Sequence, residues 1–202
     1  MELLQVRLAA PEDAADILAV YAPYITDTAI TFETEPPSPA DFAKRVAAVT
    51  AEYPYLVVER AGRIVAYAYA HRAQQRAAYG WNAELSVYAR ADCARRGLGR
   101  ALYGALLELL RLQHVRNVYG VVALPNPGSE GLHRHFGFTL LGVHPHAGYK
   151  LGAWHDVGWF GLDLGCAQPP APFLPIDQID PAAVAQILRA CGERAARGLA
   201  AR

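Results

Sequence analysis

The sequence has only three cysteines, and they are too far apart to suggest a shared structural role. Cys93, Cys166 and Cys191 are odd in number and form no CxxC pair. Disulfide frameworks and cysteine zinc sites need an even set or closely spaced pairs. We therefore expect neither, and this cysteine usage fits the reducing cytosol best.

The chain also lacks net charge and long apolar runs. Its 202 residues include 19 Lys and Arg and 19 Asp and Glu, so the formal net charge is zero. A general nucleic-acid binder needs a basic excess, so we expect no nucleic-acid partner. No apolar run reaches the roughly 18 residues of a membrane span. The N-terminal residues carry acids in their first apolar stretch and show no signal-peptide pattern, which predicts a cytoplasmic protein without membrane contact.

Several short functional motifs are missing as well. The chain has no GxxxxGK[ST] string, which excludes a Walker A loop, and we find no internal repeat. The histidine pairs His133-x-His135 and His144-x-His146 have no acid or cysteine at the usual ligand spacing. We therefore expect no metal site.

Apolar residues are abundant enough for one buried core. Hydrophobic residues make up 53% and charged residues 19%, which excludes a disordered chain, and the length suits one domain. After Leu164 the composition changes to a proline-rich stretch, and Asp180-Pro181 then begins an alanine-rich helix. We expect a folded domain over residues 1–165, and a linker plus an amphipathic helix over residues 166–202. That helix should pack on the domain or on a second subunit.

Hydrophobic periodicity divides the first 165 residues into strands and helices. Strands are predicted over residues 4–8, 55–60, 63–71, 84–89, 118–124, 138–143 and 154–164. Helices are predicted after Pro11, after the N-cap Ser38, and over residues 99–113 and 127–136. The pair Ala61-Gly62 predicts a hairpin turn. From residue 84 to 143 strands and helices alternate, which predicts parallel or crossover connections in an α/β or α+β sheet.

The clearest chemical signal lies just before the helix over residues 99–113. A strand ends at Ala89, and the chain passes through Arg95-Arg96-Gly97-Leu98-Gly99-Arg100. Glycines allow close backbone approach, and the free N–H groups of a helix N-terminus suit a phosphate or pyrophosphate. The glycine spacing does not continue into the GxGxxG of a Rossmann fold. The alternative is a glycine-rich turn with solvated arginines.

Together with Asn126-Pro127 and residues 132–138 (LHRHFGF), this loop resembles the signatures of the GCN5-related N-acetyltransferase (GNAT) superfamily. Five more strings resemble phosphinothricin N-acetyltransferases and methionine sulfoximine or sulfone acetyltransferases: residues 31–36, 53–57, 76–81, 84–88 and 152–158. The resemblance covers roughly residues 5–165. It implies the acyl-CoA N-acyltransferase fold, a mixed twisted sheet with helices on both faces. It also implies acetyl-CoA as acetyl donor and a homodimer.

The resemblance further implies where acetyl-CoA binds. The pantetheine arm is expected along the strand that ends at Ala89, and the pyrophosphate on the backbone amides of the arginine-glycine loop. Asn126 is expected to touch the cofactor arm. The expected cofactor-binding residues are Val87, Tyr88, Ala89, Arg95, Arg96, Gly97, Leu98, Gly99, Arg100, Asn126 and His135.

Three side chains are candidates for proton transfer. A substrate ammonium must lose a proton before its nitrogen attacks a thioester, and Glu84 is the expected base, with Tyr79 and Trp81 close by. Its alternative role is a solvated or ion-paired carboxylate at a strand end. His133 occupies the helix position where many superfamily members place a tyrosine acid, and histidine titrates near neutrality. His133 could instead serve only to pack the helix. The alternative acid is Tyr103, in the first turn of the cofactor helix.

The acceptor pocket follows from the resemblance too. Arg76 is expected to bind a carboxylate or phosphinate through its planar guanidinium. The full expected substrate-binding set is Phe32, Arg76, Ala78 and Tyr79, with the two aromatic rings as apolar walls. Glu33 stands where a close phosphinothricin-type relative would carry arginine, and Gln74 where a basic residue is usual. Both changes make this side of the pocket less positive.

These observations predict direct acetyl transfer from acetyl-CoA to the amino group of a small amino-acid-like substrate, of the phosphinothricin or methionine sulfoximine and sulfone type. Both substrates would be bound together, and catalysis would come from positioning and proton removal. No covalent intermediate is expected, because the place of Cys93 suits packing. The alternatives are acetylation of a protein or peptide amine, and a non-catalytic CoA-binding domain.

Overall fold

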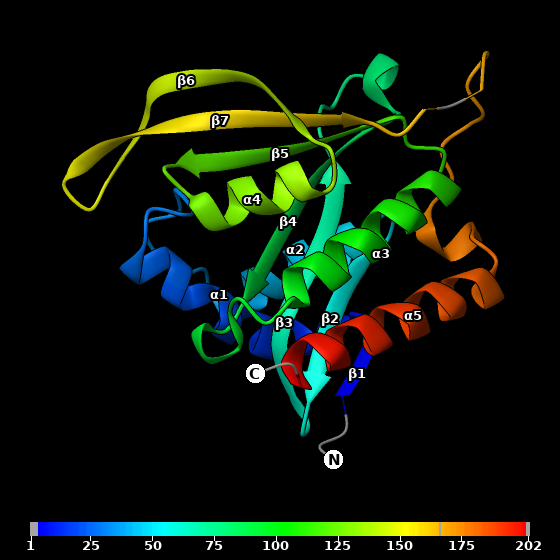
Figure 1. Ribbon diagram of the computed structural model, residues 1–202, viewed down its shortest axis with the longest axis horizontal. Helices are drawn as coiled ribbons and strands as arrows, with labels where there is room; N and C mark the ends of the chain where they lie inside the picture. Colours follow the sequence, from blue (N-terminus) through cyan, green and yellow to red (C-terminus); the bar gives the residue numbers. More distant parts are fainter. Residues whose placement is uncertain (1–3, 166, 201–202) are drawn as a thin grey trace.

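Figure 1 shows a mixed sheet of seven strands with helices packed on both faces. This computed structural model describes residues 4–165 and 167–200, so Cys166 lies outside the described residues. The strands are β1 (Leu4–Leu8), β2 (Tyr55–Arg60), β3 (Arg63–Arg72), β4 (Asn82–Ala89), β5 (Asn117–Leu124), β6 (Thr139–Lys150) and β7 (Ala153–Asp163). They lie in the order β1-β2-β3-β4-β5-β7-β6, with β4 and β5 parallel and the other neighbours antiparallel. The expected mixed sheet and its crossover are confirmed.

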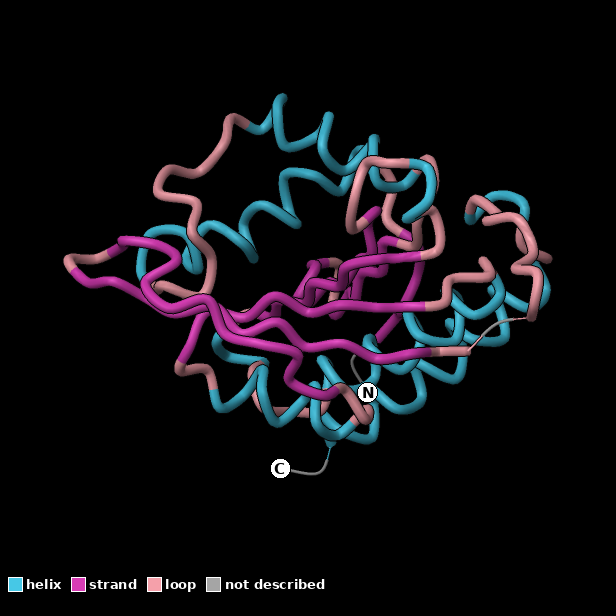
Figure 2. Tube along the Cα trace, turned by 90° about the horizontal axis from the view of Figure 1, so that it is seen from above, coloured by secondary structure: helices cyan, strands magenta, loops and turns pink. Residues whose placement is uncertain are grey.

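The helices form one layer on each side of the sheet, as the view from above shows (Figure 2). They are α1 (Ala14–Asp27), α2 (Pro39–Thr50), α3 (Leu98–Leu112), α4 (Pro127–His135) and α5 (Pro181–Ala200). Short 3-10 turns are η1 (Pro11–Asp13), η2 (Ala77–Tyr79), η3 (Ala91–Cys93) and η4 (Ile176–Gln178). The apolar side chains of α1 and α2 pack on one face, and those of α3, α4 and α5 on the other.

Side chains alternate between these two layers along the central strands. Leu56, Ala66 and Ala68 belong to the core under α3, whereas Val57 and Tyr67 belong to the core under α1 and α2. Since successive strand residues point to opposite faces, each central strand contributes to both cores. The face under α1 and α2 is lined by large aromatic rings, and the face under α3 by small and aliphatic residues.

The local turn and cap signals are confirmed. Ala61 and Gly62 have φ angles of 51° and 73°, which suits the tight turn of the β2–β3 hairpin. The Ser38 hydroxyl accepts a hydrogen bond from the Asp41 amide at 3.1 Å and caps α2. The main difference is β6, which continues to Lys150 and not to residue 143 as predicted. Residues 144–150 form part of an exposed edge strand, so they lack the apolar alternation that marks a strand in sequence.

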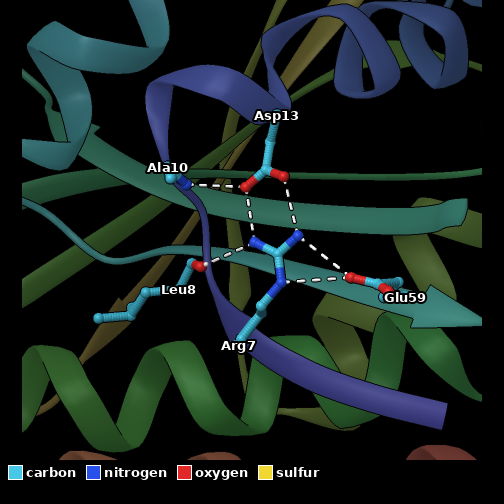
Figure 3. A network of polar contacts seen from close by, with 5 residues as sticks. All are labelled: Arg7, Leu8, Ala10, Asp13 and Glu59. Carbon is cyan, nitrogen blue, oxygen red and sulfur yellow. Dashed lines mark hydrogen bonds and ion pairs between the residues drawn. The ribbon is translucent and has the colours of Figure 1, made fainter. Parts of the chain in front are cut away.

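Arg7 ties the first strand to the start of α1 (Figure 3). Its guanidinium donates to both carboxylate oxygens of Asp13, at 2.6 and 2.8 Å, and to Glu59 on β2 at 3.2 and 3.3 Å. Asp13 also accepts from the Ala10 amide at 2.8 Å. The hydrogen bonds from Arg7 hold the pKa of Asp13 below its ordinary value. One arginine therefore links β1, β2 and η1, and fixes where α1 leaves the sheet.

The proline-rich segment and α5 pack back on the domain. The Trp81 indole donates to the Ala171 carbonyl at 2.7 Å, and the buried Gln113 amide donates to Leu174 at 2.8 Å. The helix α5 lies against α3 and β1, with Cys191 fully buried. At its far end, Gly198 touches the backbone of Arg96: a Cβ on Gly198 would lie 2.2 Å from the Arg96 oxygen.

Among the described residues, no helix combines the length and the apolar character needed to span a membrane.

Candidate active site

The sheet opens between β4 and β5. These parallel strands pair only at three positions, from Asn82 with Asn117 to Glu84 with Tyr119. β5 then continues beside β7 as far as Leu124, and β4 beside β3 as far as Ala89. Within the described part of the chain, the β5-facing backbone of Leu85–Ala89 therefore has no strand partner. Unpaired backbone groups at this edge are available to a ligand that carries amides.

A cavity of about 700 Å³ fills this opening. Eleven of the residues proposed from sequence line it together: Val87, Tyr88, Ala89, Arg95, Gly97, Leu98, Gly99, Arg100, Tyr103, Asn126 and His133. Arg96 instead lies under α5, and His135 is exposed on α4, where its ring contacts Phe136. The structure also adds Tyr24, Ile30 and Ser129, which no short motif marked.

The loop before α3 has the backbone of an anion site. Arg95 and Gly97 take the left-handed conformation, with φ of 59° and 78°, and Gly97 precedes α3 without a side-chain cap. The first N–H groups of a helix have no partner within the helix and attract negative charge. Arg95 and Arg100 line the same cavity and add positive charge. Asn126, across the opening, uses its Oδ1 to cap α4 through the Ser129 amide at 3.1 Å, so its amide N–H groups can serve a ligand.

Tyr103 and His133 meet at the inner wall of this cavity. The Tyr103 oxygen lies 3.1 Å from His133 Nε2, and His133 Nδ1 lies 2.8 Å from the Ser129 carbonyl. A carbonyl oxygen only accepts, so Nδ1 carries the proton and Nε2 accepts from the Tyr103 hydroxyl. Tyr103 was expected in the first turn of the helix, but α3 begins at Leu98 and Tyr103 lies in its second turn.

Burial sets the protonation of this pair. His133 is 2% exposed, and desolvation lowers its pKa, which favours the neutral imidazole. Desolvation, with a contribution from the charge of Glu84, raises the pKa of Tyr103. Tyr103 therefore keeps its proton. The His133 ring fits because residue 120 is glycine: a Cβ there would lie 1.9 Å from Nε2.

Glu84 lies on the other face of the sheet, below α1 and α2. It points to the same side as Ser86 and Tyr88, and its side chain is 24% exposed. Burial raises the pKa of Glu84, and the nearby charge of His71 lowers it. The distance from His71 Nε2 to Glu84 Oε1 is 3.8 Å. Glu84 is therefore a half-buried carboxyl with the His71 ring at ion-pair distance.

Sequence reasoning missed His71. It pairs directly with Glu84 in the β3–β4 register, although 12 sequence positions separate them. A connection as long as residues 73–81 is compatible with several pairing registers of the two strands. The sequence alone therefore does not predict that these two side chains are neighbours.

A second, smaller cavity of about 230 Å³ lies on the same face as Glu84. Its lining is mostly aromatic and also includes charged groups: Tyr21, Glu33, Phe42, Arg45, Val46, Val49, Tyr55, Tyr67, Tyr69 and His71. Glu33 is paired within the protein, because Arg45 donates to both its oxygens at 2.9 Å and Tyr21 donates at 3.0 Å.

The residues proposed for the acceptor pocket are dispersed. Arg76, Ala78 and Tyr79 lie on and beside η2, between β3 and β4, and Tyr79 is 43% exposed. Phe32 packs against the β6–β7 hairpin, where a Cβ on Gly148 would lie 2.3 Å from its ring. This close approach anchors the loop after α1 to that hairpin. The structure thus places these four residues outside the linings of both cavities.

The ionisable side chains of the described residues do not form a metal-binding site. In the described ranges, no cluster of three His, Cys, Asp or Glu side chains is placed to hold a metal ion. Cys93 is buried beside the larger cavity, and burial raises the pKa of its thiol. A protonated thiol is a weak nucleophile, in agreement with a packing role.

Comparison with known proteins identifies the fold. The family model described as "Acetyltransferase (GNAT) domain" matches residues 6–159. The chain is 36% identical over 176 residues to the phosphinothricin N-acetyltransferase of Streptomyces viridochromogenes, covering 87% of this chain and 96% of that one. It is 35% identical over 165 residues to the L-methionine sulfoximine/L-methionine sulfone acetyltransferase of Pseudomonas paraeruginosa, covering 79% and 94%.

A solved structure extends the match to three dimensions. The crystal structure of a GNAT superfamily phosphinothricin acetyltransferase from Sinorhizobium meliloti, in complex with AcCoA, superimposes with a TM-score of 0.79. The two chains are 30% identical, and the match covers 88% of this chain and 96% of that one. The mixed sheet that opens beside the glycine-containing loop before α3 agrees with the sequence matches along nearly all of the chain. This chain belongs to the GNAT acetyltransferases, in the family of phosphinothricin and methionine sulfoximine N-acetyltransferases.

Proposed function

We propose that this protein transfers the acetyl group of acetyl-CoA to the amino group of a small amino-acid-like substrate, of the phosphinothricin or methionine sulfoximine and sulfone type. The observation that carries the proposal is the unpaired edge of β4, which leads from the anion loop toward Glu84. An extended arm with amide groups can hydrogen-bond along such an edge while its pyrophosphate lies on the loop before α3. The names of the relatives support the same donor and the same class of acceptor.

The reaction needs one base and one acid. The acceptor ammonium gives a proton to Glu84, directly or through a water, and its nitrogen forms a bond to the thioester carbon. The nitrogen of the adduct then loses its second proton, the carbon–sulfur bond breaks, and the leaving thiolate takes up a proton to give free CoA, so that one proton is released overall. Glu84 suits the base role because burial raises its pKa toward neutrality.

Tyr103 is the acid that this arrangement favours over His133. Both nitrogens of His133 are engaged, one with the Ser129 carbonyl and one with the Tyr103 hydroxyl, and the lowered pKa keeps the ring neutral. Tyr103 keeps its proton and lines the larger cavity, and its single hydroxyl proton must turn from His133 Nε2 toward the sulfur. His133 then orients the Tyr103 hydroxyl and does not itself donate to sulfur.

Acceptor binding is proposed on the face with Glu84, where Phe32 anchors the loop over the sheet. Arg76 remains the proposed partner of a substrate carboxylate or phosphinate, together with Ala78 and Tyr79 near the start of β4. The second cavity adds no unpaired cation to these, because Arg45 is held by Glu33. We therefore propose a preference for acceptors with a single anionic group.

Assembly and location are part of the same proposal. We propose a homodimer, because large apolar side chains are exposed together along the β6–β7 hairpin: Leu140, Leu141, Tyr149, Leu151 and Trp154. We propose the cytoplasm as the site of action, in keeping with the free thiols of Cys93 and Cys191. Residues 1–165 are proposed as the catalytic domain and residues 166–202 as its supporting extension.

Thiol release from acetyl-CoA tests the proposal. The acceptor panel contains phosphinothricin, methionine sulfoximine, methionine sulfone, free amino acids and a lysine peptide. We expect turnover with the amino-acid analogues and at least 100-fold slower turnover for Glu84→Gln, with acetyl-CoA affinity within threefold. Turnover with the peptide alone would move the function to protein acetylation, and acetyl-CoA binding without turnover on any acceptor would leave a binding domain.

A further inference from the structure

The geometry points to a further residue in the proton chemistry: we infer that His71 is a positioning residue that keeps Glu84 ionised. The inference rests on the proposed role of Glu84 as base. His71 and Glu84 are direct cross-strand partners on β3 and β4, on the face under α1 and α2. Two side chains that lie directly opposite each other on neighbouring antiparallel strands are close enough to interact.

The hydrogen bonds of His71 determine which nitrogen faces Glu84. Its Nδ1 lies 3.1 Å from the Arg72 carbonyl, which only accepts, so Nδ1 carries a proton. The other nitrogen, Nε2, lies 3.8 Å from Glu84 Oε1. With a neutral ring, a lone pair of Nε2 would face the oxygens of an ionised carboxylate. The contact becomes attractive when the ring carries a second proton and Glu84 carries none.

The other polar groups around His71 have partners of their own or stay neutral. The polar groups that line the cavity with His71 are Tyr21 of α1, Glu33 of the following loop, Arg45 of α2, Tyr55 of β2, and Tyr67 and Tyr69 of β3. Arg72 follows His71 on β3, and Tyr119 of β5 is the cross-strand partner of Glu84. Glu33 and Arg45 are paired with each other, and Arg72 lies 3.4 Å from Glu52. Burial raises the pKa of each of the four tyrosines that line the cavity, to about 12 for Tyr21, so they stay uncharged. Of these groups, His71 is the one that forms an ion pair with Glu84 when its ring is protonated.

The consequence for Glu84 follows from two opposing effects. Burial favours the neutral carboxylic acid, which cannot act as a base. The imidazolium of His71 favours the carboxylate. Without His71 only the first effect remains, so Glu84 would ionise at a higher pH and the enzyme would lose its base in slightly acidic solution.

Two substitutions separate this role from a structural one. In His71→Asn, the amide nitrogen can still donate to the Arg72 carbonyl, but nothing replaces Nε2. In His71→Gln, a neutral amide reaches toward Glu84 and can donate a hydrogen bond without becoming charged. We expect the ascending limb of kcat/KM against pH to move upward by about 1 pH unit in His71→Asn, and by less in His71→Gln. At the alkaline plateau both should lie within about threefold of the parent, with unchanged KM for acetyl-CoA.

A titration without substrate keeps the inference independent of the proposed function. The protein is labelled with ¹³C at the glutamate carboxyl carbons, and Glu84→Gln assigns the signal of Glu84. We expect the midpoint of Glu84 to rise in His71→Asn, with an unchanged melting temperature as control for folding. An unmoved midpoint, or a loss of activity that is equal at all pH values, would overturn the inference. If no acceptor is turned over, the proposed function fails, and the midpoint still decides the role of His71.

Discussion

Replacing Gly198 by alanine tests whether α5 supports the anion loop from below. The added Cβ would lie 2.2 Å from the Arg96 oxygen and 3.2 Å from the Arg96 carbonyl carbon. Ordinary contact begins near 3.4 Å, so the backbone of Arg96, or the end of α5, must move by roughly 1 Å. Neither neighbour is the flexible tip of a side chain. Relief of such an overpacked contact costs about 1–3 kcal/mol.

That cost should appear in acetyl-CoA binding. Arg96 directly precedes Gly97, whose left-handed backbone presents the start of α3. If the loop yields, its amides leave the positions that suit a pyrophosphate, and a loss of about 1.4 kcal/mol corresponds to tenfold weaker binding. We therefore expect a KM for acetyl-CoA about tenfold higher, while the KM for the acceptor changes little. Steady-state kinetics with each substrate varied in turn measures both.

Gly192→Ala provides the matched control on the same helix. A Cβ there would have its nearest neighbour, Val6, at 3.9 Å, which is ordinary contact. Alanine inside a helix is about 0.5–1 kcal/mol more favourable than glycine, so this variant should melt at a slightly higher temperature with unchanged kinetics. A Gly198→Ala variant that keeps both the parent KM for acetyl-CoA and the parent melting temperature would show that α5 does not support the loop.

Three further substitutions test other contacts. Gly120→Ala should displace the His133 ring and lower the unfolding free energy by about 1–3 kcal/mol in urea titrations. Tyr103→Phe should lower kcat about 10–100-fold while leaving the KM for acetyl-CoA within threefold; unchanged kcat would remove it as the acid. Arg7→Met should lower the free energy of unfolding by about 1–3 kcal/mol at pH 7. Since Arg7 lowers the pKa of Asp13, that cost should shrink as the pH falls through the carboxyl range, as acid-dependent unfolding would report.

The features that sequence predicted well are those specified by near neighbours in the chain. Ser38 and Asp41 make a helix cap by themselves, and Ala61-Gly62 makes a turn by itself. In the arginine-glycine loop, Gly97 likewise predicts the left-handed backbone that the structure shows at this residue. In each case the physical cause lies within about six residues, so the pattern is visible without the fold.

The features that sequence did not predict depend on the register and packing of distant segments. His71 meets Glu84 because of the β3–β4 register, and Phe32 meets Gly148 because a loop folds onto a hairpin. Gly198 meets Arg96 across about a hundred residues. The aromatic second cavity forms where side chains from α1, α2, β2 and β3 converge. Such contacts depend on how the helices and the hairpin pack on the sheet, so a short sequence motif cannot predict them.

The short pairing of β4 with β5 has a consequence for the stability of the protein. Three residue pairs join the two halves of the sheet, and beyond Glu84 the strands separate. An acetyl-CoA arm along the edge of β4 would act as a substitute strand and restore backbone hydrogen bonding across the gap. Ligand that binds only the folded state stabilises it in proportion to the logarithm of its concentration. The amides of Leu85–Ala89 that face β5 would then exchange with solvent more slowly as the acetyl-CoA concentration rises. The supply of acetyl-CoA would therefore set how stably the enzyme that consumes it is folded.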